Sequence, residues 1–483
     1  MLNSLKYFLI FLLVVASLGV RFYKIDNPLA DWHSWRQADT AAVARNFEKI
    51  GFNPFLPRYD DLSNVQSGQE NPEGYRLVEF PLYQTVGFMF YKALPFFSLE
   101  IWLRLVNIIS SVFTGLILYN LVAKYFGKKE GWATLFIFSF LPYSVYYSRV
   151  ILPEMFGVVL SLTAIFLMDK IYEQKNLTHK WYVVFFASAL FAALAMLVKP
   201  TMFFLLIPLV FYFWQLRKKF INYRLIYWVV FALIVVLPLL TWRWWISHFP
   251  AGIPANEWLL NGGNIRFTGA FFRWLLAERL GKLMLGFGGL VFFFLGVVRQ
   301  EIKPGGRLFW FFLLGIGLYA VIFARGNVQH DYYQIIWLPG VVIYTGIGMV
   351  ALFSYAKSFL SWLKIVLVAV LCFFMMLAFS WYEIKGYYWV NHPEIIEAGK
   401  RVDVLTPKNA KVIAPYVGDT AFLYQTNRQG WPVVNRPIPE MIKQGAQFLV
   451  IVNPDEGALN LEKDYKILEK GNKYIIFDLR NPS

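Results

Sequence analysis

Long apolar runs recur along the chain and alternate with short polar segments. Most runs approach the roughly 20 residues that an α-helix needs to cross a hydrocarbon core about 30 Å thick. The pattern therefore predicts a polytopic α-helical membrane protein. The candidate spans are residues 6–20, 103–123, 131–147, 153–169, 181–198, 201–215, 226–246, 282–298, 308–323, 332–353 and 361–382.

Composition supports this interpretation. Hydrophobic residues make up 58% of the 483 residues, charged residues make up 16%, and the mean hydropathy is +0.48. A soluble domain is about 45–50% apolar and about 25% charged. The net charge of +16 does not indicate a nucleic-acid partner, because the basic residues cluster in short loops between spans. Cys372 is the only cysteine, so no intramolecular disulfide can form.

The predicted topology depends on whether the apolar segment 80–97 crosses the membrane. This segment is short and contains Pro81, Gly87, Lys92 and Pro95. If it does not cross, the strongly basic short loops all fall on one side, as the positive-inside rule requires. We therefore expect a juxtamembrane or re-entrant helix here and about eleven to thirteen spanning helices elsewhere. The N-terminus is then cytoplasmic and the C-terminal domain exported, in a multi-pass protein of the cell (plasma or inner) membrane.

Two regions of different character are expected. The first is a transmembrane domain over residues 1–385 with an exported loop at 21–102, and the second is a soluble, exported α/β domain over 386–483. Residues 1–20 also resemble a signal peptide, but the run is long and no clear cleavage site follows, so we expect an uncleaved first helix. Strands that alternate with helices are typical of a small α/β domain. Its expected helices are residues 393–405 and 438–444, and its expected strands are 412–414, 448–452 and 474–477.

A cluster of ionisable residues follows the first span and contains Asp31, His33, Arg36 and Asp39. Ionisable groups are costly near hydrocarbon, so such a cluster is a functional-site hypothesis. If residues 37–47 form a helix, Asp39 lies in its first turn, where the helix dipole favours a carboxylate without any catalytic role. That explanation does not apply to Asp31.

The short exported loops carry a second group of charged residues. Arg149, Glu154 and Lys199 lie at the ends of apolar spans. Snorkelling to the membrane surface can explain the two basic residues, but it does not explain Glu154 after Ile-Leu-Pro. The sequence requires no cofactor. A divalent metal bound by Asp31 and Glu154 is an alternative, because the Asp-x-His spacing of Asp31 and His33 permits a metal site without defining one.

The order of these elements resembles the GT-C membrane glycosyltransferases, specifically the branch of the protein O-mannosyltransferases and the lipid A aminoarabinose transferase. Asp31 matches the Asp of the acidic pair in that family, whereas Trp32 stands where the Glu would be. Arg149-Val-Ile-Leu-Pro-Glu154 is similar to the family's Arg-x-Ile-Leu-Leu-Asp. The segments Glu79-Phe-Pro-Leu-Tyr83 and His330-Asp-Tyr-Tyr333 also resemble family elements. The resemblance extends over residues 1–350, approximately.

This resemblance implies an inverting glycosyltransferase, either a hexosyl- or a pentosyltransferase, that acts at the exported face of the membrane. Its donor would be a sugar linked to a polyprenyl phosphate such as undecaprenyl phosphate. Its acceptor would be a glycan, lipid or protein, as in the synthesis of cell-envelope glycans. The lipid bilayer is the other partner, and nucleic acid is not one.

The resemblance also suggests roles for the candidate residues. Asp31 is the expected base, Asp39 is its competitor, and Glu154 would orient a neighbour of Asp31. Positive charge for the phosphate is available from Lys199, Arg36 and Arg149. The remaining candidate substrate-binding residues are His33, Glu79, Tyr83, His330 and Tyr333.

A transporter or flippase of lipid-linked sugars is the alternative function. Transporters usually place paired, broken helices and charges near the midplane of the membrane, often with internal repeats. In this chain the charges gather on one face and no repeat is found, so the pattern favours an enzyme.

Overall fold

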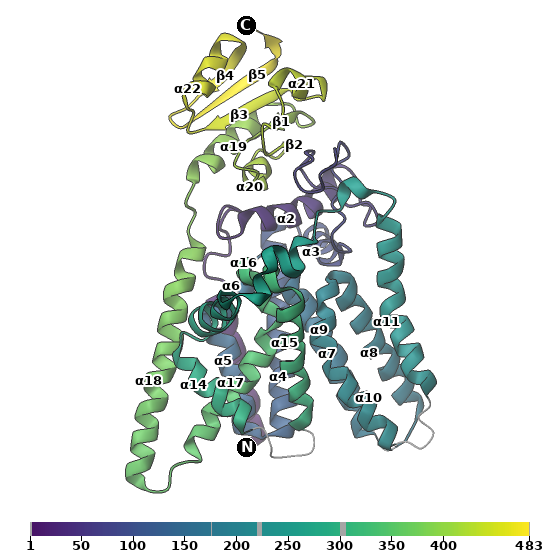
Figure 1. The fold of residues 1–483 in the computed structure, drawn as a ribbon, viewed down its shortest axis with the longest axis vertical. Helices are drawn as coiled ribbons and strands as arrows, with labels where there is room; N and C mark the ends of the chain where they lie inside the picture. Colours follow the sequence, from purple (N-terminus) through teal and green to yellow (C-terminus); the bar gives the residue numbers. More distant parts are fainter. Residues whose placement is uncertain (1, 175, 220–224, 300–305, 483) are drawn as a thin grey trace. The chain divides into compact units, whose positions relative to one another are not determined.

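The computed structural model of the protein describes residues 2–174, 176–219, 225–299 and 306–482 (Figure 1). By their contacts the residues group into two compact units. The helical unit comprises Met1–Ile25, Arg104–Arg243 and Asn256–Gly386. The mixed unit comprises Asp26–Leu103, Trp244–Ala255 and Tyr387–Ser483. The segment after the first helix therefore packs in the same unit as the C-terminal α/β region.

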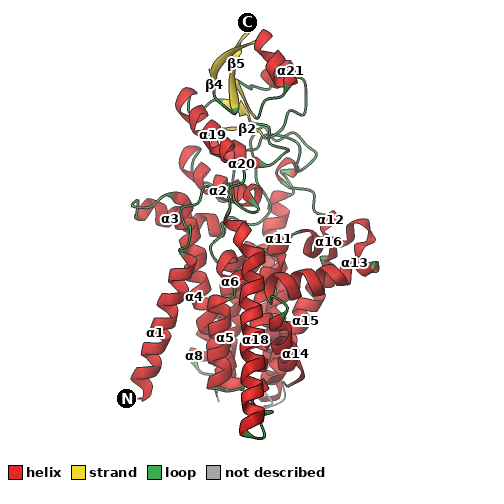
Figure 2. Cartoon of the chain, turned by 90° about the vertical axis from the view of Figure 1, so that its left-hand side faces the viewer, coloured by secondary structure: helices red, strands yellow, loops and turns green. Residues whose placement is uncertain are grey.

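The helical unit consists mainly of apolar helices; Figure 2 draws all helices of the chain in red. Five helices of the described chain are long and apolar enough to cross a membrane, or up to seven if each bent pair is one span. The predicted helical membrane protein is confirmed, whereas the count of about eleven to thirteen spans and the sidedness stay predictions. The helices that lie in or enter this unit are α1 (Leu2–Arg21), α4 (Leu99–Tyr125), α5 (Lys128–Phe140), α6 (Pro142–Tyr147), α7 (Glu154–Glu173), α8 (His179–Val198), η1 (Pro200–Met202), α9 (Phe203–Leu206), α10 (Pro208–Lys219), α11 (Leu225–Ile246), α12 (Trp258–Asn261), η3 (Gly262–Phe267), α13 (Gly269–Phe272), η4 (Arg273–Met284), α14 (Gly288–Val298), α15 (Arg307–Ile322), α16 (Ala324–Gln329), η6 (Asp331–Ile336), α17 (Leu338–Phe353), α18 (Phe359–Ile384) and η7 (Lys385–Tyr388).

The expected span over residues 282–298 contains a sharp bend. The helical segments Gly269–Met284 and Gly288–Val298 meet at 113°. Gly286 between them has a φ of 47°, which favours glycine, and a Cβ there would lie 2.5 Å from the carbonyl oxygen of Met376. The uninterrupted apolar pattern gave no sign of this turn, because glycine does not lower hydropathy enough to mark a boundary.

The mixed unit contains the predicted α/β region. Its sheet has the order β2-β1-β3-β5-β4, with β1 parallel to β2 and β3, and with β5 antiparallel to β3 and β4. The expected helices and strands are all present, whereas β2, β4, α20 and α22 were not expected. The elements are α2 (Ser34–Lys49), α3 (Leu82–Ala93), η2 (Pro250–Gly252), α19 (Pro393–Leu405), β1 (Lys411–Ile413), α20 (Thr420–Gln425), β2 (Gln429–Trp431), α21 (Ile438–Lys443), β3 (Phe448–Val452), α22 (Glu456–Asn460), η8 (Leu461–Lys463), β4 (Tyr465–Lys470) and β5 (Tyr474–Pro482).

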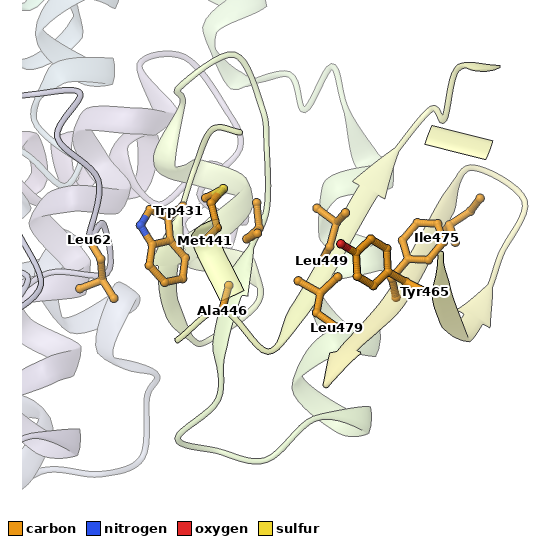
Figure 3. Packing of buried hydrophobic residues seen from close by; sticks show 10 residues of the cluster. Leu62, Trp431, Met441, Ala446, Leu449, Tyr465, Ile475 and Leu479 are labelled. Carbon is orange, nitrogen blue, oxygen red and sulfur yellow. The ribbon is translucent and has the colours of Figure 1, made fainter. Parts of the chain in front are cut away.

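Residues 60–62 extend this sheet beyond β2. Asp61 forms a parallel bridge with Gly430. The amide of Leu62 donates to the carbonyl of Gly430 at 2.7 Å, and the amide of Gly430 donates to the carbonyl of Asp60 at 2.9 Å. Leu62 also joins the buried cluster around Trp431 (Figure 3). The loop that precedes α3 is therefore part of the folded α/β region, tied to it by backbone pairing and by apolar burial.

Helix α3 corresponds to the ambiguous segment 80–97. It has 12 residues, and a helix of that length rises only about 18 Å, which is less than the ~30 Å of a hydrocarbon core. Its Phe88 packs against Phe47 of α2, with ring centroids 5.8 Å apart. This length agrees with the prediction, made from the basic loops, that the segment does not cross the membrane.

The edge residue Asp61 should make the stability of the mixed unit depend on pH. Its side chain is buried, and this burial raises the pKa of its carboxyl to about 6. In the unfolded chain the pKa is about 3.9, so the folded state binds the proton more tightly. This contribution to stability is therefore present below about pH 4 and is lost as the pH rises through 6.

We expect Asp61→Asn to leave stability unchanged at pH 4 and to raise the free energy of unfolding by about 3 kcal/mol above pH 6. The amide oxygen can still accept the hydrogen bond that the Ser63 amide donates to Asp61 Oδ1 at 2.7 Å. Thermal unfolding in detergent at pH 4, 5 and 7 measures the effect. Asp464→Asn, at an exposed position, is the control. An effect of Asp61→Asn that is the same at all three pH values contradicts the assignment.

Candidate functional site

Asp31 lies in the turn that leads into α2. Its side chain is 5% exposed, and its Oδ1 accepts a hydrogen bond from Gln37 Nε2 at 2.7 Å. The same amide nitrogen donates to the carbonyl of Trp32 at 2.9 Å. His33, the residue before the helix, has a left-handed backbone with φ of 54°, which reverses the chain into α2. Gln37 and His33 together fix Asp31 beside the first turn of the helix.

Asp39 is held by three donors from two other segments, the loop before α3 and the C-terminal region. Arg76 approaches its Oδ2 at 3.0 Å, Gln66 Nε2 donates to Oδ2 at 3.2 Å, and Thr420 Oγ1 donates to Oδ1 at 2.7 Å. The expectation that Asp39 occupies the first helical turn is wrong, because α2 begins at Ser34. The three donors, not the helix dipole, account for this carboxylate, and they favour a structural role for it.

Arg36 and Glu79 form a buried pair. The Arg36 guanidinium donates to both carboxylate oxygens of Glu79, at 2.8 and 3.0 Å. Tyr83, four residues after Glu79, is fully buried and donates to the carbonyl of Leu103 at 2.8 Å. These three predicted substrate-binding residues have protein partners: the Arg36–Glu79 pair joins α2 to the segment before α3, and Tyr83 joins α3 to α4.

In the helical unit, Lys199 and Glu154 form an ion pair. Glu154 is the first residue of α7 and is fully buried, and Lys199 follows α8. The Lys199 ammonium donates to Glu154 Oε1. It also lies 5.4 and 5.0 Å from the ring centroids of Tyr332 and Tyr333, within the range of a cation–π interaction.

Several polar atoms around this pair are buried without a hydrogen-bond partner among the described residues. They are Glu154 Oε2, Thr201 Oγ1 and the hydroxyl of Tyr319. The ring of Tyr319 stacks on that of Tyr333, with centroids 6.2 Å apart. Buried polar atoms are nearly always satisfied by protein, water or ligand. The group around Lys199 therefore has unused hydrogen-bonding capacity that water or a ligand can take up.

His330 and Arg149 have different surroundings. The imidazole of His330 stacks on the rings of Tyr332 and Tyr333, at 5.3 and 5.9 Å, so it extends the aromatic surface around Lys199. Arg149 is buried and donates to the carbonyl of Lys24 at 2.5 Å. That contact holds the chain at the end of α1.

Other residues of the site were not found from the sequence. Tyr147 donates to Asp331 Oδ1 at 2.6 Å, and Tyr143 donates to the Asp331 carbonyl at 2.7 Å. Both tyrosines lie on α6 at a helical spacing of four residues, which puts them on one face and could have indicated a shared partner. No local signal identified Thr420 as a partner of Asp39, since 381 positions separate them.

The residues suggested for a divalent metal ion are Asp31 and Glu154. In the described ranges, no group of three or more His, Cys, Asp or Glu side chains is placed to hold a metal ion. Asp31 belongs to the mixed unit and Glu154 to the helical unit. The suggestion that these two carboxylates share a divalent ion stays a prediction.

Comparison with known proteins supports the fold that the sequence suggested. The family model for dolichyl-phosphate-mannose-protein mannosyltransferases matches residues 94–242, the stretch that contains Arg149, Glu154 and Lys199. No curated protein matches the chain by sequence.

Solved structures match over most of the chain. ArnT from Cupriavidus metallidurans bound to undecaprenyl phosphate aligns with a TM-score of 0.65 and 13% identity, over 96% of this chain and 97% of ArnT. A second match is the archaeal oligosaccharyltransferase AglB from Archaeoglobus fulgidus, in complex with an inhibitory peptide and a dolichol-phosphate. It aligns with a TM-score of 0.56 and 10% identity, over 96% of this chain and 73% of AglB. The arabinofuranosyltransferase AftD from Mycobacteria aligns with a TM-score of 0.55 and 14% identity, over 97% of this chain and 41% of AftD.

The fold is that of the GT-C membrane glycosyltransferases. Within that class, the predicted resemblance to the branch of the protein O-mannosyltransferases and the lipid A aminoarabinose transferase is confirmed.

The buried ion pair of Asp39 gives a test of its structural role. Asp39→Ala leaves the Arg76 guanidinium buried without its carboxylate, which should cost about 3–5 kcal/mol of stability. Glu73→Ala removes an ion pair with Arg58 at the surface, where the Arg58 side chain is 33% exposed and the Glu73 side chain 53% exposed. Loss of that pair should cost less than about 1 kcal/mol. Thermal unfolding of both variants measures the difference. Equal losses would contradict a structural role for Asp39.

Proposed function

We propose that this protein is an inverting glycosyltransferase that moves a monosaccharide from a polyprenyl-phosphate donor to an acceptor hydroxyl at the exported face of the membrane. The observation that carries the proposal is the Lys199–Glu154 pair, set on an aromatic surface and surrounded by unsatisfied buried polar atoms. The likeness in fold to ArnT, which was crystallised with undecaprenyl phosphate, supports a lipid-phosphate ligand.

Lys199 is the proposed cation for the phosphate of the donor. Its ammonium has three N–H donors, and Glu154 Oε1 accepts one hydrogen bond from it. The other N–H groups can serve phosphate oxygens, which carry the negative charge that develops as the sugar leaves. Arg325 is a second candidate, since it is half-buried and no hydrogen bond or ion pair joins it to another described residue.

Asp31 is the proposed base. As the acceptor oxygen attacks the anomeric carbon, the carboxylate takes the hydroxyl proton, the new C–O bond forms, and the bond between that carbon and the phosphate oxygen breaks. Attack from the side opposite the phosphate inverts the configuration. Asp39 is the less suitable base, because Arg76, Gln66 and Thr420 already use its lone pairs.

The proposed reaction neutralises the phosphate with protein cations. Glu154 already has the Lys199 ammonium as its counter-ion, so we assign this role to Lys199 rather than to a divalent ion. The sugar is a hexose or pentose, and the acceptor is a glycan, lipid or protein of the cell envelope. The C-terminal domain is proposed to lie on the exported side of the cell membrane, and the residues assigned to the reaction are proposed to face that side as well.

We expect Lys199→Ala to raise the KM for the donor at least about tenfold, because a charge-assisted contact to phosphate contributes about 1.5–3 kcal/mol. The KM for the acceptor should stay unchanged. Lys282→Ala is the matched control, since Lys282 forms a 3.1 Å ion pair with Glu383 in the same unit and should change neither constant. Steady-state transfer from a short-chain polyprenyl-phosphate sugar measures all three proteins. An unchanged donor KM in Lys199→Ala refutes the phosphate assignment.

We expect Asp31→Asn to lower kcat at least about 100-fold, because a positioned general base typically contributes 10²–10⁴-fold. Donor binding should stay intact, since the amide keeps the shape of the carboxylate. Asp39→Asn should act through stability instead. A folded but inactive Asp39→Asn, together with near-normal turnover in Asp31→Asn, would exchange the two roles. Wild-type protein that moves lipid-linked sugar across proteoliposomes without transferring it would favour the flippase.

A further inference from the structure

Trp32, the residue directly after Asp31, presents an indole ring that is fixed in place yet 43% exposed. Its ring stacks on that of Tyr387, with centroids 4.7 Å apart and an interplanar angle of 14°. Its amide donates to the carbonyl of Tyr387 at 3.2 Å. One face of the indole is therefore covered by a partner from the start of the C-terminal region, and the His33 imidazole lies 5.1 Å from the same ring at an angle of 59°. With these two partners, 43% of the residue stays accessible.

The backbone around Trp32 is fixed on both sides. Its carbonyl accepts a hydrogen bond from Gln37 Nε2 at 2.9 Å, and the same amide nitrogen donates to Asp31 Oδ1 at 2.7 Å. Asn27 Nδ2 donates to the carbonyl of Tyr388 at 2.9 Å, which fixes the segment carrying Tyr387. The Gln37 amide thus joins the backbone of Trp32 to the carboxylate of the proposed base, and the stack on Tyr387 orients the indole.

We propose that the Trp32–Tyr387 stack is a platform for the sugar ring of the lipid-linked donor. A monosaccharide has an apolar face of C–H groups, which packs on an aromatic ring, and hydroxyls at its edge that stay free for polar partners. A rigid, exposed indole next to the base offers a surface of this kind, and aromatic side chains give large contact areas with few rotatable bonds. The donor is the appropriate ligand because it always carries a sugar, whichever acceptor the protein uses.

This inference rests on the proposed function and adds to it a residue that recognises the sugar rather than the lipid phosphate. It separates two parts of donor binding. Lys199 is assigned to the phosphate, and Trp32 is assigned to the sugar. A ligand that lacks the sugar should therefore be insensitive to Trp32.

Binding of two probes to the purified full-length protein in detergent tests the platform. The probes are a short-chain polyprenyl-phosphate sugar and the same polyprenyl phosphate without sugar. We expect Trp32→Leu to weaken binding of the sugar-bearing probe about tenfold, which corresponds to 1.4 kcal/mol, and to leave the bare phosphate unchanged. Trp32→Phe keeps an aromatic face and should stay near the wild-type affinity.

The matched control is Trp389→Leu, because Trp389 is 55% exposed in the same unit. It should leave binding of both probes unchanged. Equal affinity of wild type and Trp32→Leu for the sugar-bearing probe overturns the platform. Equal loss for both probes also overturns it, since that result describes a membrane anchor or a folding defect. Failure of wild-type protein to transfer sugar, with the Trp32 effect on binding present, refutes the transferase and leaves the platform standing.

Discussion

The buried pair of Asp39 and Arg76 is the constraint on which the geometry around Asp31 depends. Both side chains are almost completely buried, and buried charges are costly unless each finds a partner and further hydrogen bonds. Thr420 supplies one of those bonds from α20, and Gln66 supplies another. Because α2, the loop before α3 and the C-terminal region must all meet at one carboxylate, the position of α2 is fixed. Asp31, Trp32 and His33 directly precede α2 in the chain, so the position of the helix determines where they lie.

Helix α7 carries a buried acid near each end, and the two acids differ in a way that separates structure from function. Asp169 accepts from Lys124 at 2.7 Å, from Tyr125 at 2.6 Å and from Tyr212 at 3.0 Å. Its carboxylate is fully satisfied by the protein. Glu154 also has a lysine partner, but its Oε2 has no hydrogen-bond partner in the described part of the chain. The Lys124–Asp169 pair thus joins helices through a fully satisfied carboxylate at one end of α7. The Lys199–Glu154 pair leaves an unsatisfied carboxylate oxygen at the other end.

The sequence predicted the helices and strands that depend on a local pattern of residues. It did not predict the elements and contacts that depend on pairing between distant segments. Helix 393–405 and strand 448–452 were located to the residue, because a proline opens the helix and the strand is a continuous apolar run. Strand β2 was missed, since Gln429–Trp431 has no alternation and is defined by pairing with β1 and with residues 60–62. The candidate residues Asp31, Glu154 and Lys199 were visible as charges beside apolar spans. The partners that distinguish Asp31 from Asp39 were not, because Arg76 and Thr420 are set by tertiary contacts.

A single carboxylate beside a fixed indole suggests how the chemistry is divided in this chain. The family that the chain resembles has an acidic pair at this point, and here Trp32 takes the second place. An indole can neither accept a proton nor hold a cation by an oxygen ligand, so it cannot replace the missing carboxylate in acid–base work. It can contribute a flat apolar surface. In the proposed reaction the proton goes to Asp31, the negative charge of the leaving phosphate meets the Lys199 ammonium, and the indole contacts the sugar. Each of these tasks then falls to a side chain whose chemistry fits it, and none requires a second acid.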